Sequence, residues 1–114
     1  MDAERGEERR VWERFPARFP AKLKDSRQEY GEVSSLRNAS AAGFRMTSQE
    51  RFFVNDKVSM EVKLPDERFP LALNGEVVWV KGKDPDLWDV GVKLHKIDFL
   101  SMARLYKFVV LADT

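Results

Sequence analysis

In the stretch Lys57-Val58-Ser59-Met60-Glu61-Val62-Lys63-Leu64, every second side chain is apolar. In an extended chain these apolar side chains face one way, and the lysines, Ser59 and Glu61 face the other. The pattern is typical of a strand that packs one face on a core and leaves the other in water. Pro65-Asp66-Glu67 then interrupts the alternation, which we interpret as the end of the strand.

The same alternation, followed outward along the chain, predicts five further strands. The first contains Phe19, Ala21 and Leu23, which alternate with proline and lysine residues. A turn is expected after it at Asp25–Gln28. The other strands are predicted at Tyr30–Leu36, from Phe44 through Met46, at Leu71–Lys81 and from Trp88 to Leu94, with a turn at Gly82–Asp86 between the last two.

The predicted strand Leu71–Lys81 has apolar residues on both faces. Val78 and Val80 lie on one face, and Val77 and Trp79 lie on the other. We therefore expect both faces of this strand to be at least partly covered by other parts of the protein.

A helix is predicted after Asp98, which is a typical N-cap residue. Leu100, Phe108 and Leu111 interrupt its polar face, so that face is a candidate for contact with a second surface. Short antiparallel strands at regular spacing predict an all-β fold with one helix, namely a small six-stranded antiparallel barrel with a C-terminal helix. The apolar face that packs on the barrel should contain Phe99, Met102, Ala103, Tyr106, Val109 and Val110.

Length and composition restrict the class of protein. The 114 residues, 43% of them hydrophobic, suffice for one modest core, so we expect a single domain at residues 9–114 and a flexible tail at residues 1–8. The absence of cysteine excludes disulfides, thiolate metal sites and a cysteine nucleophile. The sequence also lacks a signal peptide and any long apolar run, so we expect a cytoplasmic protein that does not insert into membranes.

Charge is unevenly distributed along the chain. The net charge is only +1, which argues against a DNA- or RNA-binding protein with a broad basic surface. Residues 1–8 nevertheless hold four acidic side chains and one arginine, whereas residues 9–24 hold six basic side chains and one acidic one. A basic segment on a nearly neutral protein fits a small anion better than a polymer.

Two short motifs suggest which anion. Arg10-Val11-Trp12-Glu13-Arg14 places two arginines four residues apart, with Arg9 just ahead of them. Arginine presents a planar set of donors that suits phosphates and guanine edges. Asn38-Ala39-Ser40-Ala41-Ala42-Gly43 adds a carboxamide, a hydroxyl and a glycine that lets the backbone approach closely. Together the motifs suggest a pocket for a small anionic nucleotide that contains guanine.

The two motifs, in this order, resemble those of the PilZ domain family of bacterial cyclic di-GMP receptors. In that family an Arg-x-x-x-Arg motif, here Arg10 and Arg14, precedes an Asp/Asn-x-Ser-x-x-Gly motif, here Asn38, Ser40 and Gly43. Arg14-Phe15-Pro16-Ala17-Arg18 is a second candidate for the first motif. We prefer Arg10 and Arg14, because the segment from Phe19 already has the pattern of a strand.

The resemblance covers residues 9–111 and extends to later strands. Gly75-Glu76-Val77-Val78-Trp79-Val80 and Asp89-Val90-Gly91-Val92-Lys93-Leu94 are similar to the family's later strands. It implies a six-stranded barrel, a C-terminal helix and cyclic di-GMP held between the N-terminal arm and the barrel. On this basis the predicted ligand-binding residues are Arg9, Arg10, Arg14, Asn38, Ser40, Gly43 and Trp79.

These residues have distinct expected roles. The arginines Arg10 and Arg14 should contact guanine and phosphate, with Arg9 as an auxiliary. Trp79 is a candidate for stacking on a base, although packing against the core or the helix explains it equally well. We expect the ligand to order the arm, which then signals to an unidentified protein that controls motility, biofilm or surface polysaccharide. The protein itself is expected to be a monomer or weak dimer.

Three alternatives remain. The same fold could act as an adaptor through protein contacts, without binding a nucleotide. An enzyme is disfavoured, because one histidine, no cysteine and no clustered carboxylates leave neither a nucleophile–base pair nor a metal site. A small RNA-binding barrel is disfavoured by the nearly neutral charge.

Overall fold

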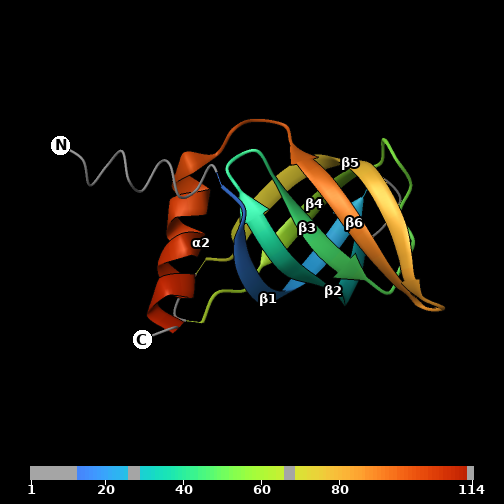
Figure 1. Ribbon diagram of the computed structural model, residues 1–114, viewed down its shortest axis with the longest axis horizontal. Helices are drawn as coiled ribbons and strands as arrows, with labels where there is room; N and C mark the ends of the chain where they lie inside the picture. The colour runs from blue at the N-terminus through green and yellow to red at the C-terminus, as the bar shows by residue number, and fades with distance from the viewer. Residues whose placement is uncertain (1–12, 26–28, 66–68, 113–114) are drawn as a thin grey trace.

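The computed structural model describes residues 13–25, 29–65 and 69–112 (Figure 1). In this part of the chain six strands pair antiparallel in the order β1-β2-β3-β6-β5-β4, and pairing of β1 with β4 closes the barrel. This arrangement confirms the predicted six-stranded barrel with a C-terminal helix. The elements are β1 (Phe15–Asp25), β2 (Glu29–Ser40), β3 (Gly43–Ser48), β4 (Lys57–Val62), β5 (Leu71–Asp84), β6 (Leu87–Leu94) and α2 (Phe99–Ala112).

Several strands differ in length from the prediction. β1 begins at Phe15 rather than near Phe19, because Phe15 and Ala17 already face the core and Pro16 is paired opposite Asn38. β4 ends at Val62, two residues earlier than expected.

The second strand and the loop after it are also corrected. β2 continues to Ser40, so the residues from Asn38 to Ser40, which follow the predicted end of the strand at Leu36, belong to the sheet. Only Ala41 and Ala42 remain as a turn, because pairing with β3 continues up to Ser40 opposite Gly43. The first two polar residues of the second motif are therefore held by strand pairing.

The strand β5 is longer than expected, and its outer face is partly covered. It extends to Asp84, so the turn predicted from Gly82 shrinks to two residues. Val77 is fully buried, whereas Val78 and Trp79 are 46% and 38% exposed. Val78 and Trp79 are therefore partly covered, which agrees with the expectation that both faces of this strand are at least partly covered.

The core fills the barrel and continues under α2, which lies across one end (Figure 1). Met102 and Leu105 of the helix are fully buried, and Tyr106 packs edge-on against Phe15 at 5.2 Å between ring centroids. Leu105 was missing from the predicted apolar face. Leu100 points away from the barrel and is 87% exposed.

Local signals fix where the helix begins. The Asp98 carboxylate accepts a hydrogen bond from the Ser101 backbone N–H at 2.9 Å, which confirms Asp98 as the N-cap. The Asp98 N–H donates to the Ala41 carbonyl at 3.1 Å, so the start of the helix is tied to the β2–β3 turn. Among the residues described, no helix has the length and hydropathy needed to cross a membrane.

Candidate functional site

A row of five residues, one from each of five strands, runs across the outer surface of the barrel. Pro16 lies opposite Asn38, Asn38 opposite Arg45, Arg45 opposite Gly91, and Gly91 opposite Trp79. Directly opposed residues in antiparallel strands have Cβ atoms about 4.5–5.5 Å apart. The pairing therefore connects the second motif, through an arginine, to the tryptophan that was predicted to stack on a base.

Two β-bulges increase the number of side chains on this surface. In β2 the register with β3 shifts between Leu36 and Asn38. In β5 the register with β6 shifts between Val77 and Trp79. A bulge places one extra residue on a strand and redirects its side chains. As a result Arg37 is only partly buried beside Asn38, although the two are consecutive in sequence.

A cavity of about 250 Å³ lies at the β1–β2 end of this row. The residues that line it come from β1, β2, β3 and the segment just before β1. We call this surface the arginine face, and it is lined by Arg14, Phe15, Pro16, Arg18, Arg37, Asn38 and Arg45.

The structure brings residues of the two motifs into contact at this cavity. Arg14 Nη1 donates a hydrogen bond to Asn38 Oδ1 at 2.7 Å. Asn38 reaches the surface because β2 continues past Leu36, and Arg14 reaches it because it lies directly before β1. Arg14 is exposed. Its side chain can therefore exchange the carboxamide for another acceptor without unfolding any part of the core.

Arg37 and Arg45 are site residues that the sequence analysis missed. The Nε atom of each is buried and makes no hydrogen bond within the part of the chain that the structure describes. Arg18 was set aside because the segment from Phe19 has the pattern of a strand, yet in the observed strand Arg18 points away from the core and lines the cavity. The same alternation in Gly43-Phe44-Arg45-Met46 was a signal that could have identified Arg45.

The charged side chains that line the arginine face all carry positive charge. Four guanidinium groups line the cavity, and none of its lining residues among those described is a carboxylate. Arginine remains charged throughout the physiological pH range. The face therefore suits a compact anion with several oxygen acceptors.

Ser40 and Gly43 of the second motif shape the turn between β2 and β3. Ser40 is 6% exposed, and its Oγ accepts from the Ala42 N–H at 3.3 Å and donates to the Gly43 carbonyl at 3.4 Å. A Cβ added to Gly43 would lie 2.4 Å from the Val92 carbonyl oxygen. The glycine thus permits a close approach of β3 to β6, next to the row.

Trp79 lies on the outer surface of the barrel and covers Gly91. A Cβ added to Gly91 would lie 2.1 Å from Nε1 of the indole. Trp79 is therefore not a core residue, and with 38% of its surface exposed it retains an accessible part. Arg9 and Arg10, the other predicted contacts, lie outside the residues that the structure describes.

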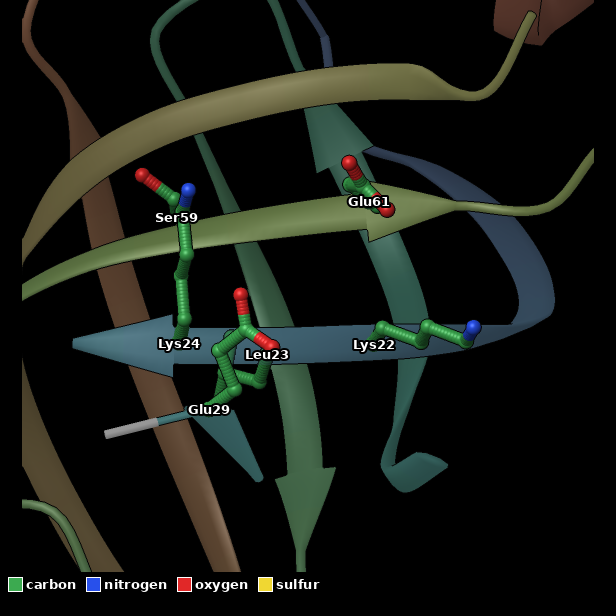
Figure 2. A pocket seen from close by; sticks show the side chains of 6 residues that line it. All are labelled: Lys22, Leu23, Lys24, Glu29, Ser59 and Glu61. Atoms are coloured by element: carbon green, nitrogen blue, oxygen red, sulfur yellow. The ribbon is translucent and has the colours of Figure 1, made fainter. Parts of the chain in front are cut away.

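A second cavity, of about 270 Å³, opens on the β1–β4 side of the barrel (Figure 2). Figure 2 shows Lys22 and Lys24 extending from β1 in different directions, Lys24 toward Ser59 of β4. The pairing sets Lys22 opposite Glu61, and Lys24 opposite both Ser59 and Glu29. We call this surface the lysine face, and it is lined by Lys22, Leu23, Lys24, Glu29, Ser59 and Glu61.

Neither face has the donor set of a metal site. Among residues 13–25, 29–65 and 69–112, no three His, Cys, Asp or Glu side chains gather as ligands of one metal ion would. The arginine face, with its guanidinium donors and a neighbouring indole, is the stronger candidate for an organic anion.

Comparisons with known proteins agree with the observed fold. Residues 8–110 match the family described as PilZ domain. The fold is similar to the Bacillus subtilis inhibitor of motility MotI/DgrA, with a TM-score of 0.61 and 14% identity over 88% of this chain. It is also similar to the PilZ domain of CeSA from a cellulose-synthesizing bacterium, with a TM-score of 0.54 and 12% identity.

The extent of these similarities differs. The match covers 49% of the motility inhibitor, so this chain spans about half of that protein's length. It covers 90% of this chain and 99% of the CeSA domain. No curated protein matches the sequence. At these identities, the two solved structures establish the fold alone.

Proposed function

Because the chain belongs to the PilZ domain family, whose members generally bind cyclic di-GMP and act on partners, we propose that it is a cyclic di-GMP receptor. The observation that carries this proposal is the contact between Arg14 and Asn38 beside a cavity lined by arginines. The family's members are binding or adaptor domains, and we infer the same for this protein rather than an enzymatic activity.

The chemistry of the arginine face fits the ligand. Cyclic di-GMP has two phosphodiesters and two guanines, and an arginine can donate to O6 and N7 of guanine together. Asn38 can both donate and accept at a base edge. Three strand spacings separate Asn38 from Trp79, at most roughly 14 Å along the surface. One guanine can therefore lie near Arg14 and Asn38 while the other stacks on Trp79.

The N-terminal arm completes the site in this proposal. Arg9 and Arg10 precede Arg14 by five and four residues, so they can close over a ligand that is seated on the barrel. Arg14 would then exchange its bond with Asn38 for contacts with guanine or phosphate. Ser40 and Gly43 would act mainly by holding the turn that positions Asn38.

We infer that ordering of the arm is the signal. A ligand that binds only the closed arm shifts the population toward it. The closed arm would create a surface for a downstream protein, in a domain at residues 9–114 that works in the cytoplasm as a monomer or weak dimer. Hydrogen exchange of residues 5–16 should slow on addition of cyclic di-GMP, and unchanged exchange would contradict the arm's role.

Control of motility is one candidate output. A solved structure with the same fold is described as an inhibitor of motility. Biofilm or surface-polysaccharide control through a protein partner is an equally suitable output for such a receptor. Each of these candidate outputs requires a partner protein that recognises the ligand-bound form of the receptor.

Calorimetry with cyclic di-GMP tests the proposed function. The wild-type chain should bind, and Arg14→Ala should weaken binding roughly 5- to 150-fold, because a good bidentate arginine contact is worth about 1–3 kcal/mol. Lys22→Ala on the lysine face serves as the matched control and should leave the affinity unchanged. A wild-type chain that fails to bind would favour the alternative, an adaptor that works through protein contacts alone.

A further inference from the structure

Two arginines of the arginine face belong to the barrel itself rather than to the arm. Arg45 lies on β3 directly opposite Asn38, and Arg37 precedes Asn38 on β2. Both are only partly exposed, whereas Arg14 and Arg18 are exposed. The strands and the bulge in β2 thus set the backbone positions of Arg37 and Arg45.

These two guanidinium groups have unused donors in a buried position. The Nε atoms of Arg37 and Arg45 are buried without a hydrogen-bond partner in the described part of the chain. Buried N–H groups are nearly always paired, and an unpaired one costs free energy. Two such donors at the same cavity mark a place where an acceptor is expected.

Among the described residues, the neighbouring side chains do not supply that acceptor to either Nε atom. The nearest carboxylate in the strand register is Asp89, which lies opposite Thr47 and diagonal to Arg45. Its buried Oδ1 also makes no hydrogen bond within the described residues, so it does not accept from Arg45. The Asn38 Oδ1 atom, a side-chain acceptor at the cavity, already accepts from Arg14.

We propose that Arg37 and Arg45 form a phosphate subsite on the barrel that works without the arm. Guanidinium donors match the spacing of phosphate oxygens, and such charge-assisted bonds are about twice as strong as neutral ones. That the phosphate belongs to cyclic di-GMP rests on the proposed function. The subsite itself rests on the position of the two side chains and on their unpaired donors.

This subsite makes ligand capture a process of two steps. One phosphodiester first binds the guanidinium groups of Arg37 and Arg45, and Arg14 then exchanges its bond with Asn38 for a contact with the ligand. Loss of an arm arginine should therefore leave weak binding that is sensitive to salt. Loss of the barrel arginines should remove the first step and weaken every anionic ligand of the site.

Nuclear magnetic resonance of the arginine Nε–H groups tests the subsite in the full-length chain. Inorganic pyrophosphate and cyclic di-GMP are the two probes. Both should shift the Nε–H signals of Arg37 and Arg45 in the wild type, and pyrophosphate should still do so in Arg14→Ala. Absence of these shifts with both probes would overturn the subsite without any reliance on variants.

Variants supply the second measurement. Arg45→Ala and Arg37→Ala should each weaken cyclic di-GMP about tenfold or more, and Arg45→Lys should not restore the affinity, because lysine lacks the planar donors. Lys24→Ala is the matched control. An affinity within about twofold of wild type in the double variant Arg37→Ala/Arg45→Ala would overturn the subsite.

The outcomes separate this inference from the proposed function. If the wild type binds cyclic di-GMP and the double variant binds equally well, the subsite is wrong and the proposed function stands. If the wild type does not bind cyclic di-GMP while pyrophosphate shifts the Nε–H signals of Arg37 and Arg45, the subsite is supported and the proposed ligand is wrong.

Discussion

The arginine face and the lysine face are two surfaces of one barrel with cavities of similar size, about 250 and 270 Å³. They differ in how their charges are arranged. On the lysine face, Lys22 and Lys24 lie opposite Glu61 and Glu29 in the strand register. On the arginine face, four guanidinium groups line the cavity without a carboxylate among its described lining residues.

The difference shows that the number of positive charges does not define an anion site. Lysine side chains are flexible and strongly hydrated, and surface charges that alternate with carboxylates compensate one another. Arg37 and Arg45 are instead partly buried, and the Nε atom of each makes no hydrogen bond within the described residues. The two faces can therefore be separated by matched changes in each.

The largest effect is expected from the glycine that brings β3 close to β6. Gly43→Ala places a Cβ against the Val92 carbonyl oxygen, which the backbone can relieve only by moving. Chemical denaturation should show a loss of about 1–3 kcal/mol of unfolding free energy, and cyclic di-GMP binding should fall with it. Gly82→Ala is the control, because its Cβ would make only ordinary contact, at 3.4 Å from Trp88. Equal stability of the two variants would contradict this role of Gly43.

The tryptophan at the end of the row gives the next largest effect. Trp79→Ala should weaken cyclic di-GMP binding roughly 5- to 150-fold, since stacking on a base is worth about 1–3 kcal/mol. Val78→Ala removes a neighbouring exposed side chain and should leave the affinity nearly unchanged. Isothermal titration of the two variants measures the contrast. If Trp79→Ala and Val78→Ala bound cyclic di-GMP with equal affinity, Trp79 would have only a structural role, in which it covers Gly91.

Reversing one charge on each face should change the affinity for cyclic di-GMP by a smaller factor. The two variants compare the arginine face with the lysine face directly. Arg18→Glu introduces a carboxylate among the guanidinium groups of the arginine face, and it should weaken cyclic di-GMP about five- to tenfold at low salt. Lys22→Glu makes the same change on the lysine face and should have almost no effect on binding. Titrations at two salt concentrations provide the measurement. A comparable loss in both variants would indicate a general response to net charge.

Much of the fold could be predicted because the alternation of apolar and polar residues indicates which face of a strand is buried. The pattern in Lys57–Leu64 located β4, and Asp98 located the start of α2. The extra length of β2 was not predictable in this way. Its residues Asn38–Ser40 resemble a turn in composition, yet the pairing with Gly43 and Phe44 extends the sheet through them.

The site could be predicted only in part, for a related reason. Arg14 and Asn38 were found through motifs, and the structure brings them into contact. Arg37 was missed because a bulge turns it outward beside Asn38, and a bulge has no simple signature in the alternation. Arg45 was missed because a single charged residue between Phe44 and Met46 has the pattern of an ordinary solvated position.

The most direct test of the central claim is a titration of the ¹⁵N-labelled chain with cyclic di-GMP, followed by nuclear magnetic resonance. The account predicts saturable shifts of the Asn38, Arg45 and Gly91 amides and of the Trp79 indole N–H, with the Lys24 and Ser59 amides unmoved. Shifts that centre on Lys24 and Ser59, or no shifts at all, would contradict it.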